Sequence, residues 1–74
     1  MDRDTAAWLE RKYGLTEAMI DAANAEQYDL LCEFAVDRVE HFENLPACQH
    51  GDKEALRAKE LTGRFADWLL SHRE

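Results

Sequence analysis

The sequence predicts an all-α fold, a compact antiparallel bundle of three main helices. Only three glycines and one proline occur in 74 residues, and 46% of the residues are hydrophobic, a share that excludes a disordered chain. Apolar side chains recur at spacings of three and four, as in amphipathic helices, and no stretch alternates with the period of a strand. We expect helices at about 5–13, 17–44 and 53–72, within a single domain spanning 1–74.

The first helix is expected to follow Asp4, which can cap its N-terminus. Two basic residues, Arg11 and Lys12, come in its last turn, where they favour the negative end of the helix dipole. Gly14 then suits the left-handed stop position, from which Leu15 can fold back onto the helix. These signals bound one short helix.

The second segment, 17–44, is expected to start at a Thr16 cap and to break or kink near Asn24. Asn24 and Gln27 have the spacing of a capping box, which would start a new helix. The alternative is one uninterrupted helix with Asn24 inside it. The break is favoured because Met19 and the apolar residues beside it do not align with the apolar face downstream.

The two long helices each carry a clear core stripe at ~100° per residue. The stripe of the central helix, widened by Leu30, Phe34 and Val36, consists of Tyr28, Leu31, Cys32, Ala35, Val39 and Phe42. The last helix should begin at an Asp52 cap after Gly51. Its stripe consists of Ala55, Ala58, Leu61, Thr62, Phe65, Trp68 and Leu69.

The connection between these helices, ENLPACQHGDK, holds the only proline and one of the two cysteines. Cys48 and His50 do not have the paired spacing of zinc ligands. Cys32 and His41, the other candidates, point to nearly opposite sides (~180°) of one helix. We therefore expect no metal and no cofactor, and we expect Cys48 to be a loop thiol that, if exposed, could crosslink two copies under oxidation.

The formal net charge of −7 is concentrated in the middle of the chain. Residues 14–52 hold nine acidic residues against Arg38 alone, and the flanking segments are close to neutral. This charge argues against binding to nucleic acid or to an anionic membrane, because both need a cationic surface. No apolar run approaches the roughly 18 residues of a membrane span, and the charged N-terminus is no secretion signal, so we expect a cytoplasmic protein. The cations that a helix-turn-helix would need lie only in the last helix, at Lys53, Arg57, Lys59 and Arg64.

Catalytic patterns are weak. Ser71 and His72 are helix neighbours ~100° apart, and the sequence places no acid beside the histidine to orient it. There is no glycine-rich phosphate loop, and the carboxylates lie on a solvated face. We expect no enzyme.

The strongest pattern outside the core is a row of carboxylates on the central helix, which we call the acidic ladder: Glu26, Asp29, Glu33, Asp37 and Glu40. Like charges four residues apart destabilise a helix by about 0.2–0.5 kcal/mol per pair. One interpretation is a solvated face that maintains solubility. Another is a face that complements a basic surface on a partner. Part of the ladder could instead pair with Lys53, Arg57 and Arg64 of the last helix, within the chain or across a dimer.

A second candidate surface lies on the last helix, at Leu56, Gly63, Ala66 and Leu70. It could pack against the first helix, or it could be a self-association seam. A symmetric dimer through this seam would compensate for the small core of a short chain.

These patterns predict a binding module that docks on a basic partner protein through the acidic ladder and regulates it. If that partner normally holds nucleic acid, the regulation would be inhibition. The small, acidic, helical profile resembles that of phage or mobile-element regulators, some of which imitate the charge of DNA. The alternative is a self-associating structural or accessory subunit, a homodimer with no inhibitory role.

Overall fold

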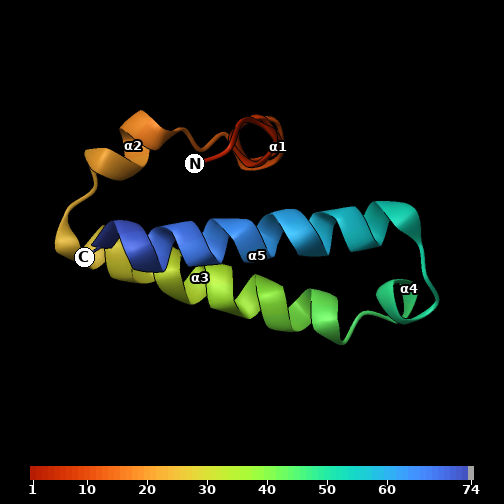
Figure 1. The fold of residues 1–74 in the computed structure, drawn as a ribbon. Coiled ribbons are helices and arrows are strands. Elements are labelled where there is room, and N and C mark those ends of the chain that lie inside the picture. The colour runs from red at the N-terminus through yellow and green to blue at the C-terminus, as the bar shows by residue number, and fades with distance from the viewer. Residues whose placement is uncertain (74) are drawn as a thin grey trace.

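The computed structural model describes residues 1–73, which form five helices and no strand (Figure 1). The helices are α1 (Arg3–Tyr13), α2 (Glu17–Asp21), α3 (Ala25–Glu43), α4 (Pro46–Gln49) and α5 (Lys53–Arg73). The all-α prediction is confirmed, and the predicted break is present because residues 22–24 separate α2 from α3. Within residues 1–73, no helix combines the length and the apolar character needed to cross a bilayer.

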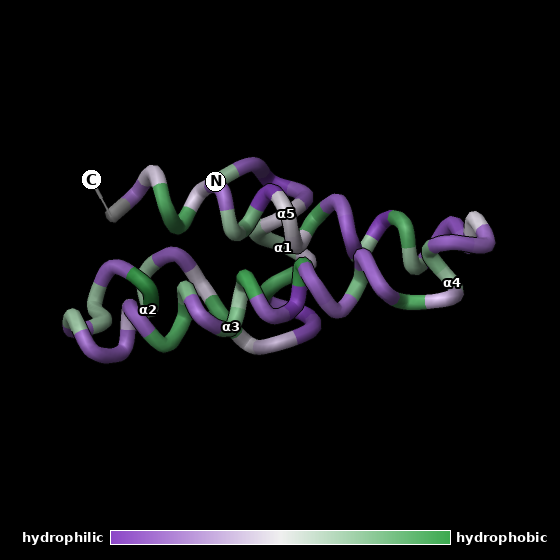
Figure 2. Tube along the Cα trace, turned by 90° about the horizontal axis from the view of Figure 1, so that it is seen from below, coloured by the Kyte–Doolittle hydropathy of each residue, from purple (hydrophilic) through white to green (hydrophobic). Residues whose placement is uncertain are grey.

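The two long helices, α3 and α5, lie side by side in opposite directions, and α4 lies at the turn between them (Figure 1). The short α1 is seen nearly end-on in that view, so it crosses the pair, and in Figure 2 it passes behind both long helices. The most buried apolar side chains lie where the helices meet: Leu9, Ile20, Ala35, Phe65 and Leu69. The fold is therefore a pair of long helices, α3 and α5, covered by the short helices α1 and α2.

Helix α1 begins two residues earlier than the sequence suggests. The carboxylate of Asp2, not that of Asp4, accepts hydrogen bonds from the Thr5 backbone N–H at 3.1 Å and the Thr5 hydroxyl at 2.7 Å. The expected Asp4 cap is therefore wrong, because only Asp2 has Thr5 three residues downstream to donate twice. The stop at Gly14 is confirmed, since its φ is 67° and the following N–H, of Leu15, folds back onto α1.

The other predicted helix starts are confirmed. The Thr16 hydroxyl accepts the Met19 N–H at the start of α2. Asn24 and Gln27 form both hydrogen bonds of a capping box, which explains why α3 starts afresh and does not continue α2. Asp52 accepts from two backbone N–H groups in the first turn of α5.

The connection between α3 and α5 differs from the expected loop. Pro46 occupies the first turn of α4, where its missing N–H costs nothing. The expectation that Cys48 is a loop thiol is wrong, because Cys48 lies in α4, which turns it inward and leaves it 8% exposed. Burial removes Cys48 as a crosslinking site.

Candidate functional site

Helix α3 presents the acidic ladder on one side and the core on the other. All five ladder residues are exposed, whereas Ala35 and Phe42 of the core stripe are buried. At ~100° per residue the five carboxylates fall within a sector of about 80°. The ladder is therefore a continuous solvent-facing row and not a set of separate surface charges.

Arg57 and Arg64 of α5 pair with carboxylates outside this row. The Arg57 guanidinium lies 3.1 Å from Asp4 and 3.1 Å from Glu60. The Arg64 guanidinium pairs with Asp2 at 3.3 Å and also with Glu60. The predicted pairing of these arginines with the ladder within the chain is wrong, because each arginine pairs with Glu60 of α5 and with an aspartate near the N-terminus.

Four ladder residues form no ion pair with any side chain that the structure describes: Glu26, Glu33, Asp37 and Glu40. The nearby cation, Arg38, extends over the ring of Phe42 at 5.2 Å and not toward the ladder. The row therefore keeps its negative field on the solvent side of α3.

An apolar groove opens beside the ladder, between α2 and α3. Its volume is about 310 Å³, and Gln27 is the only polar residue in a lining that otherwise consists of Leu15, Met19, Ile20, Ala23, Leu30 and Leu31. We call it the α2–α3 groove. Met19 and Leu30 are 54% and 60% exposed, the highest values for large hydrophobic side chains in residues 1–73. The expectation that Leu30 widens the core stripe is therefore wrong.

The other edge of the ladder is also apolar. Val36, expected to extend the core stripe, is exposed and borders a shallow hollow of about 440 Å³ together with Cys32, Glu33 and Asp37. Exposed apolar side chains thus flank the carboxylates on both sides. Such an arrangement combines a charged row with uncharged contact area, as protein interfaces do.

No known protein family, curated protein or solved structure gives a significant match to this chain. Among the residues that the structure describes, the ladder and the groove beside it place exposed carboxylates next to exposed apolar side chains.

The second predicted surface does not lie together as one patch. Ala66 is buried in the core cluster, whereas Leu56 and Leu70 are exposed. A methyl group added at Gly63 would meet nothing within 4 Å, so no other helix approaches it closely within the chain. The surface therefore reduces to two exposed leucines on either side of an open glycine, and α1 does not cover them.

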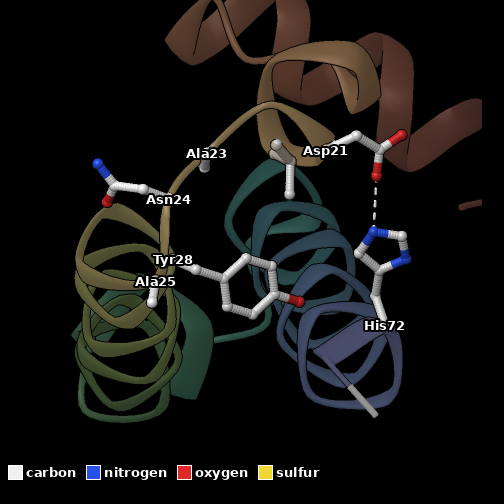
Figure 3. Close-up of a pocket in the computed structure, with 7 residues that line it drawn as sticks. Asp21, Ala23, Asn24, Ala25, Tyr28 and His72 are labelled. Carbon is white, nitrogen blue, oxygen red and sulfur yellow. Dashed lines mark hydrogen bonds and ion pairs between the residues drawn. The ribbon is translucent and has the colours of Figure 1, made fainter.

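A third feature joins the ends of three helices, at a pocket of about 320 Å³ (Figure 3). His72 at the end of α5 points toward Asp21 of α2, with Nε2 2.6 Å from the carboxylate oxygen. The histidine ring also stacks on Trp68, with ring centroids 4.5 Å apart. Tyr28 extends from α3 toward α5 and donates its hydroxyl to the Leu69 carbonyl.

The expectation that no acid orients His72 is wrong, because Asp21 does so across 51 positions of sequence. Ser71 is not among the residues that line this pocket. The contacts of Asp21, Tyr28 and His72 join α2 and α3 to the last turns of α5. They therefore fix the two helices that form the groove relative to α5.

The metal-ligand types are dispersed. Within residues 1–73, no three side chains among histidine, cysteine, aspartate and glutamate come together in a group that could hold an ion. Cys32 is half-buried on α3. Cys48 is buried in α4, which follows the C-terminal end of α3, whereas the groove lies near the N-terminal end of α3.

Proposed function

We propose that this chain is a protein-binding module that docks on the basic surface of a partner protein and regulates it. The observation that carries the proposal is the acidic ladder, which is exposed and keeps four carboxylates without an ion pair among the described residues. An ordinary surface helix mixes lysine among its acids, and α3 accepts the repulsion instead.

The charge and the apolar edges would have different roles in such a complex. Exposed carboxylates accelerate encounter with a basic partner and disfavour acidic ones, but each adds little affinity. Buried contact area provides most of the affinity, and Leu30 and Val36 offer it on either edge of the ladder.

The dimensions suit a partner that normally holds nucleic acid. From Glu26 to Glu40 the ladder extends about 21 Å at 1.5 Å per residue. A duplex advances 3.4 Å along its axis per base pair, so the ladder is as long as a duplex track of about six base pairs. Occupation of such a track by carboxylates would exclude the nucleic acid, and the regulation would then be inhibition.

The proposal is tested by affinity capture from a lysate of the source organism, with mass spectrometry of the retained proteins. The informative variant replaces Glu33 and Asp37 by lysine, and a matched variant makes the same charge change at Glu54 and Asp67, which are exposed on α5. A basic protein retained by the wild type and by the α5 variant, but lost from the ladder variant, supports the proposal. Equal retention by all three chains contradicts it, provided that circular dichroism shows unchanged helix content.

A second candidate function is that of a self-associating accessory subunit, favoured by the exposure of Leu56 and Leu70 at 41% and 53%. A dimer through these residues would bury apolar surface that α1 leaves open. Sedimentation velocity decides this candidate, because a monomer at micromolar concentration removes it.

A further inference from the structure

The α2–α3 groove is held open by contacts at its ends. The capping box of Asn24 and Gln27 fixes the turn that separates its two walls. At the end of α2, Asp21 binds His72 of α5, and the neighbouring Ile20 is 2% exposed and anchors α2 in the core. The groove is therefore a preformed feature of the fold, and an occupant would not have to order its walls.

The chemistry of the groove is that of an apolar recognition site. Its floor and walls are aliphatic, and the Gln27 side-chain oxygen is already bonded to the Asn24 N–H. Met19 lies at its lip, and the flexible, polarisable methionine side chain suits adaptable binding surfaces. Met19 and Leu30 stay in contact with water until a bound partner buries them, and their burial would favour binding.

Charge identifies the kind of occupant. Leu30, on the lip, lies one helical turn after Glu26 and three residues before Glu33, so two ladder carboxylates border it. A second copy of this chain would bring its own net charge of −7 against that border, which disfavours self-pairing here. The complementary occupant is apolar where it enters the groove and cationic where it meets the ladder.

We propose that the α2–α3 groove seats an amphipathic helix of the partner, with bulky apolar residues on one face and lysine or arginine beside them. This inference rests on the proposed function and names the partner element that the ladder and the groove would recognise together. A helix is favoured over an extended strand because residues 1–73 contain no sheet edge to which a strand could add. Its apolar anchors enter between α2 and α3, and its cations face Glu26 and Glu33.

The test uses two synthetic peptides of about 18 residues, a length that gives roughly five helical turns. The first carries leucines at helical spacing and lysines elsewhere, and the second has the same lysines but serine in place of every leucine. Binding is followed by fluorescence anisotropy with a labelled peptide. The expected result is that only the first peptide binds tightly to the wild-type protein.

Variants of the protein locate the binding site. Met19→Gln and Leu30→Gln should each weaken the leucine–lysine peptide about tenfold or more, because a bulky apolar contact is lost. Leu70→Gln, an equally exposed position on α5, should leave binding unchanged. All three positions are exposed, so the fold should tolerate the substitutions, and circular dichroism verifies this.

Each contrary result has a distinct meaning. If the leucine-free peptide binds as tightly and Leu30→Gln has no effect, the groove proposal is overturned while the acidic ladder keeps its proposed role. A different result would be that Leu30→Gln abolishes binding but the double variant Glu33→Lys with Asp37→Lys binds the peptide as tightly as the wild type. That result would contradict both the proposal that the bound helix is cationic and the proposed role of the acidic ladder. If neither peptide binds, the groove proposal is overturned and the capture experiment alone tests the proposed function.

Discussion

Arg57 of α5 lies 3.1 Å from Asp4 of α1, measured from the guanidinium nitrogen to the carboxylate oxygen. The hydrogen bond with Glu60, and then the contact with Asp4, raise the pKa of Arg57 above its already high value. Arg64, seven residues further on, makes the same kind of contact with Asp2. Both arginines thus pair with carboxylates outside α3, and neither pairs with the ladder.

A first prediction concerns the cost of the ladder. Glu33 has a like charge four residues away on each side, at Asp29 and Asp37. Glu33→Gln should therefore stabilise the fold by about 0.2–0.5 kcal/mol per relieved pair, and less at high salt, where the repulsion is screened. Urea unfolding at low and high salt measures this. Glu54→Gln, in the first turn of α5 where an acid favours the helix dipole, should have the opposite sign.

A second prediction compares one substitution at two tyrosines. The Tyr28 hydroxyl donates to the Leu69 carbonyl, whereas the buried Tyr13 hydroxyl has no hydrogen-bond partner in the described part of the chain. Tyr28→Phe should cost about 0.5–1.5 kcal/mol, because a net favourable hydrogen bond is lost. Tyr13→Phe should be neutral or stabilising, because it removes an unsatisfied polar atom. Equal effects in urea unfolding would contradict the hydrogen-bond assignment.

A third prediction follows from the cap of α1. Hydrogen bonds from the Thr5 hydroxyl and N–H, with a smaller contribution from Arg64, lower the pKa of Asp2. The stability that this carboxylate adds is present above its unfolded-state pKa of about 3.9 and is lost as the pH falls through the lower folded-state value. At neutral pH, the wild type should therefore unfold at a higher urea concentration than the Asp2→Asn variant.

That advantage over Asp2→Asn should shrink as the pH falls through the lowered folded-state pKa of Asp2, since the cap then loses its charge. Thr5→Val, which removes the hydroxyl donor but keeps the buried volume, should raise the Asp2 pKa toward its ordinary value. A stability difference between the wild type and the Asp2→Asn variant that stays constant with pH would refute the assigned role of the charge.

A fourth prediction uses the glycines. Gly63 lies inside α5 with open space around it, so Gly63→Ala should stabilise the fold by about 0.5–1 kcal/mol. Gly14→Ala should destabilise it, because Gly14 adopts a φ of 67° that alanine disfavours. Sedimentation of Gly63→Ala provides the further check. Loss of an association state present in the wild type would show that Gly63 contacts a second copy, which would support the self-association candidate.

Local chemistry explains which parts of the fold the sequence predicts. Gly14, the pair Asn24 and Gln27, and Asp52 act on backbone groups within a few residues, so their spacing alone marks where helices stop and start. The choice between Asp2 and Asp4 as a cap is harder because both are suitable acids. The decisive signal is nevertheless present in the sequence, since Thr5 stands three residues after Asp2.

Contacts between residues that are far apart in the sequence explain what the sequence does not predict. Asp21 and His72 are joined only because α5 returns along α3, and no local pattern relates them. Leu30 resembles a core residue because it lies near the apolar stripe, but α2 stops short of covering it. The misaligned Met19 is the available signal, since an apolar residue off the common face marks a surface that the fold leaves open.

The most direct measurement of the central claim is a calorimetric titration of the captured basic partner with three chains at two salt concentrations. The chains are the wild type, the double variant Glu33→Lys with Asp37→Lys, and the matched α5 double variant Glu54→Lys with Asp67→Lys. If the ladder selects the partner, wild-type affinity falls as salt rises. The ladder variant then binds at least about tenfold more weakly, and the α5 variant binds like the wild type. Salt-independent binding of equal strength by all three chains would contradict the account.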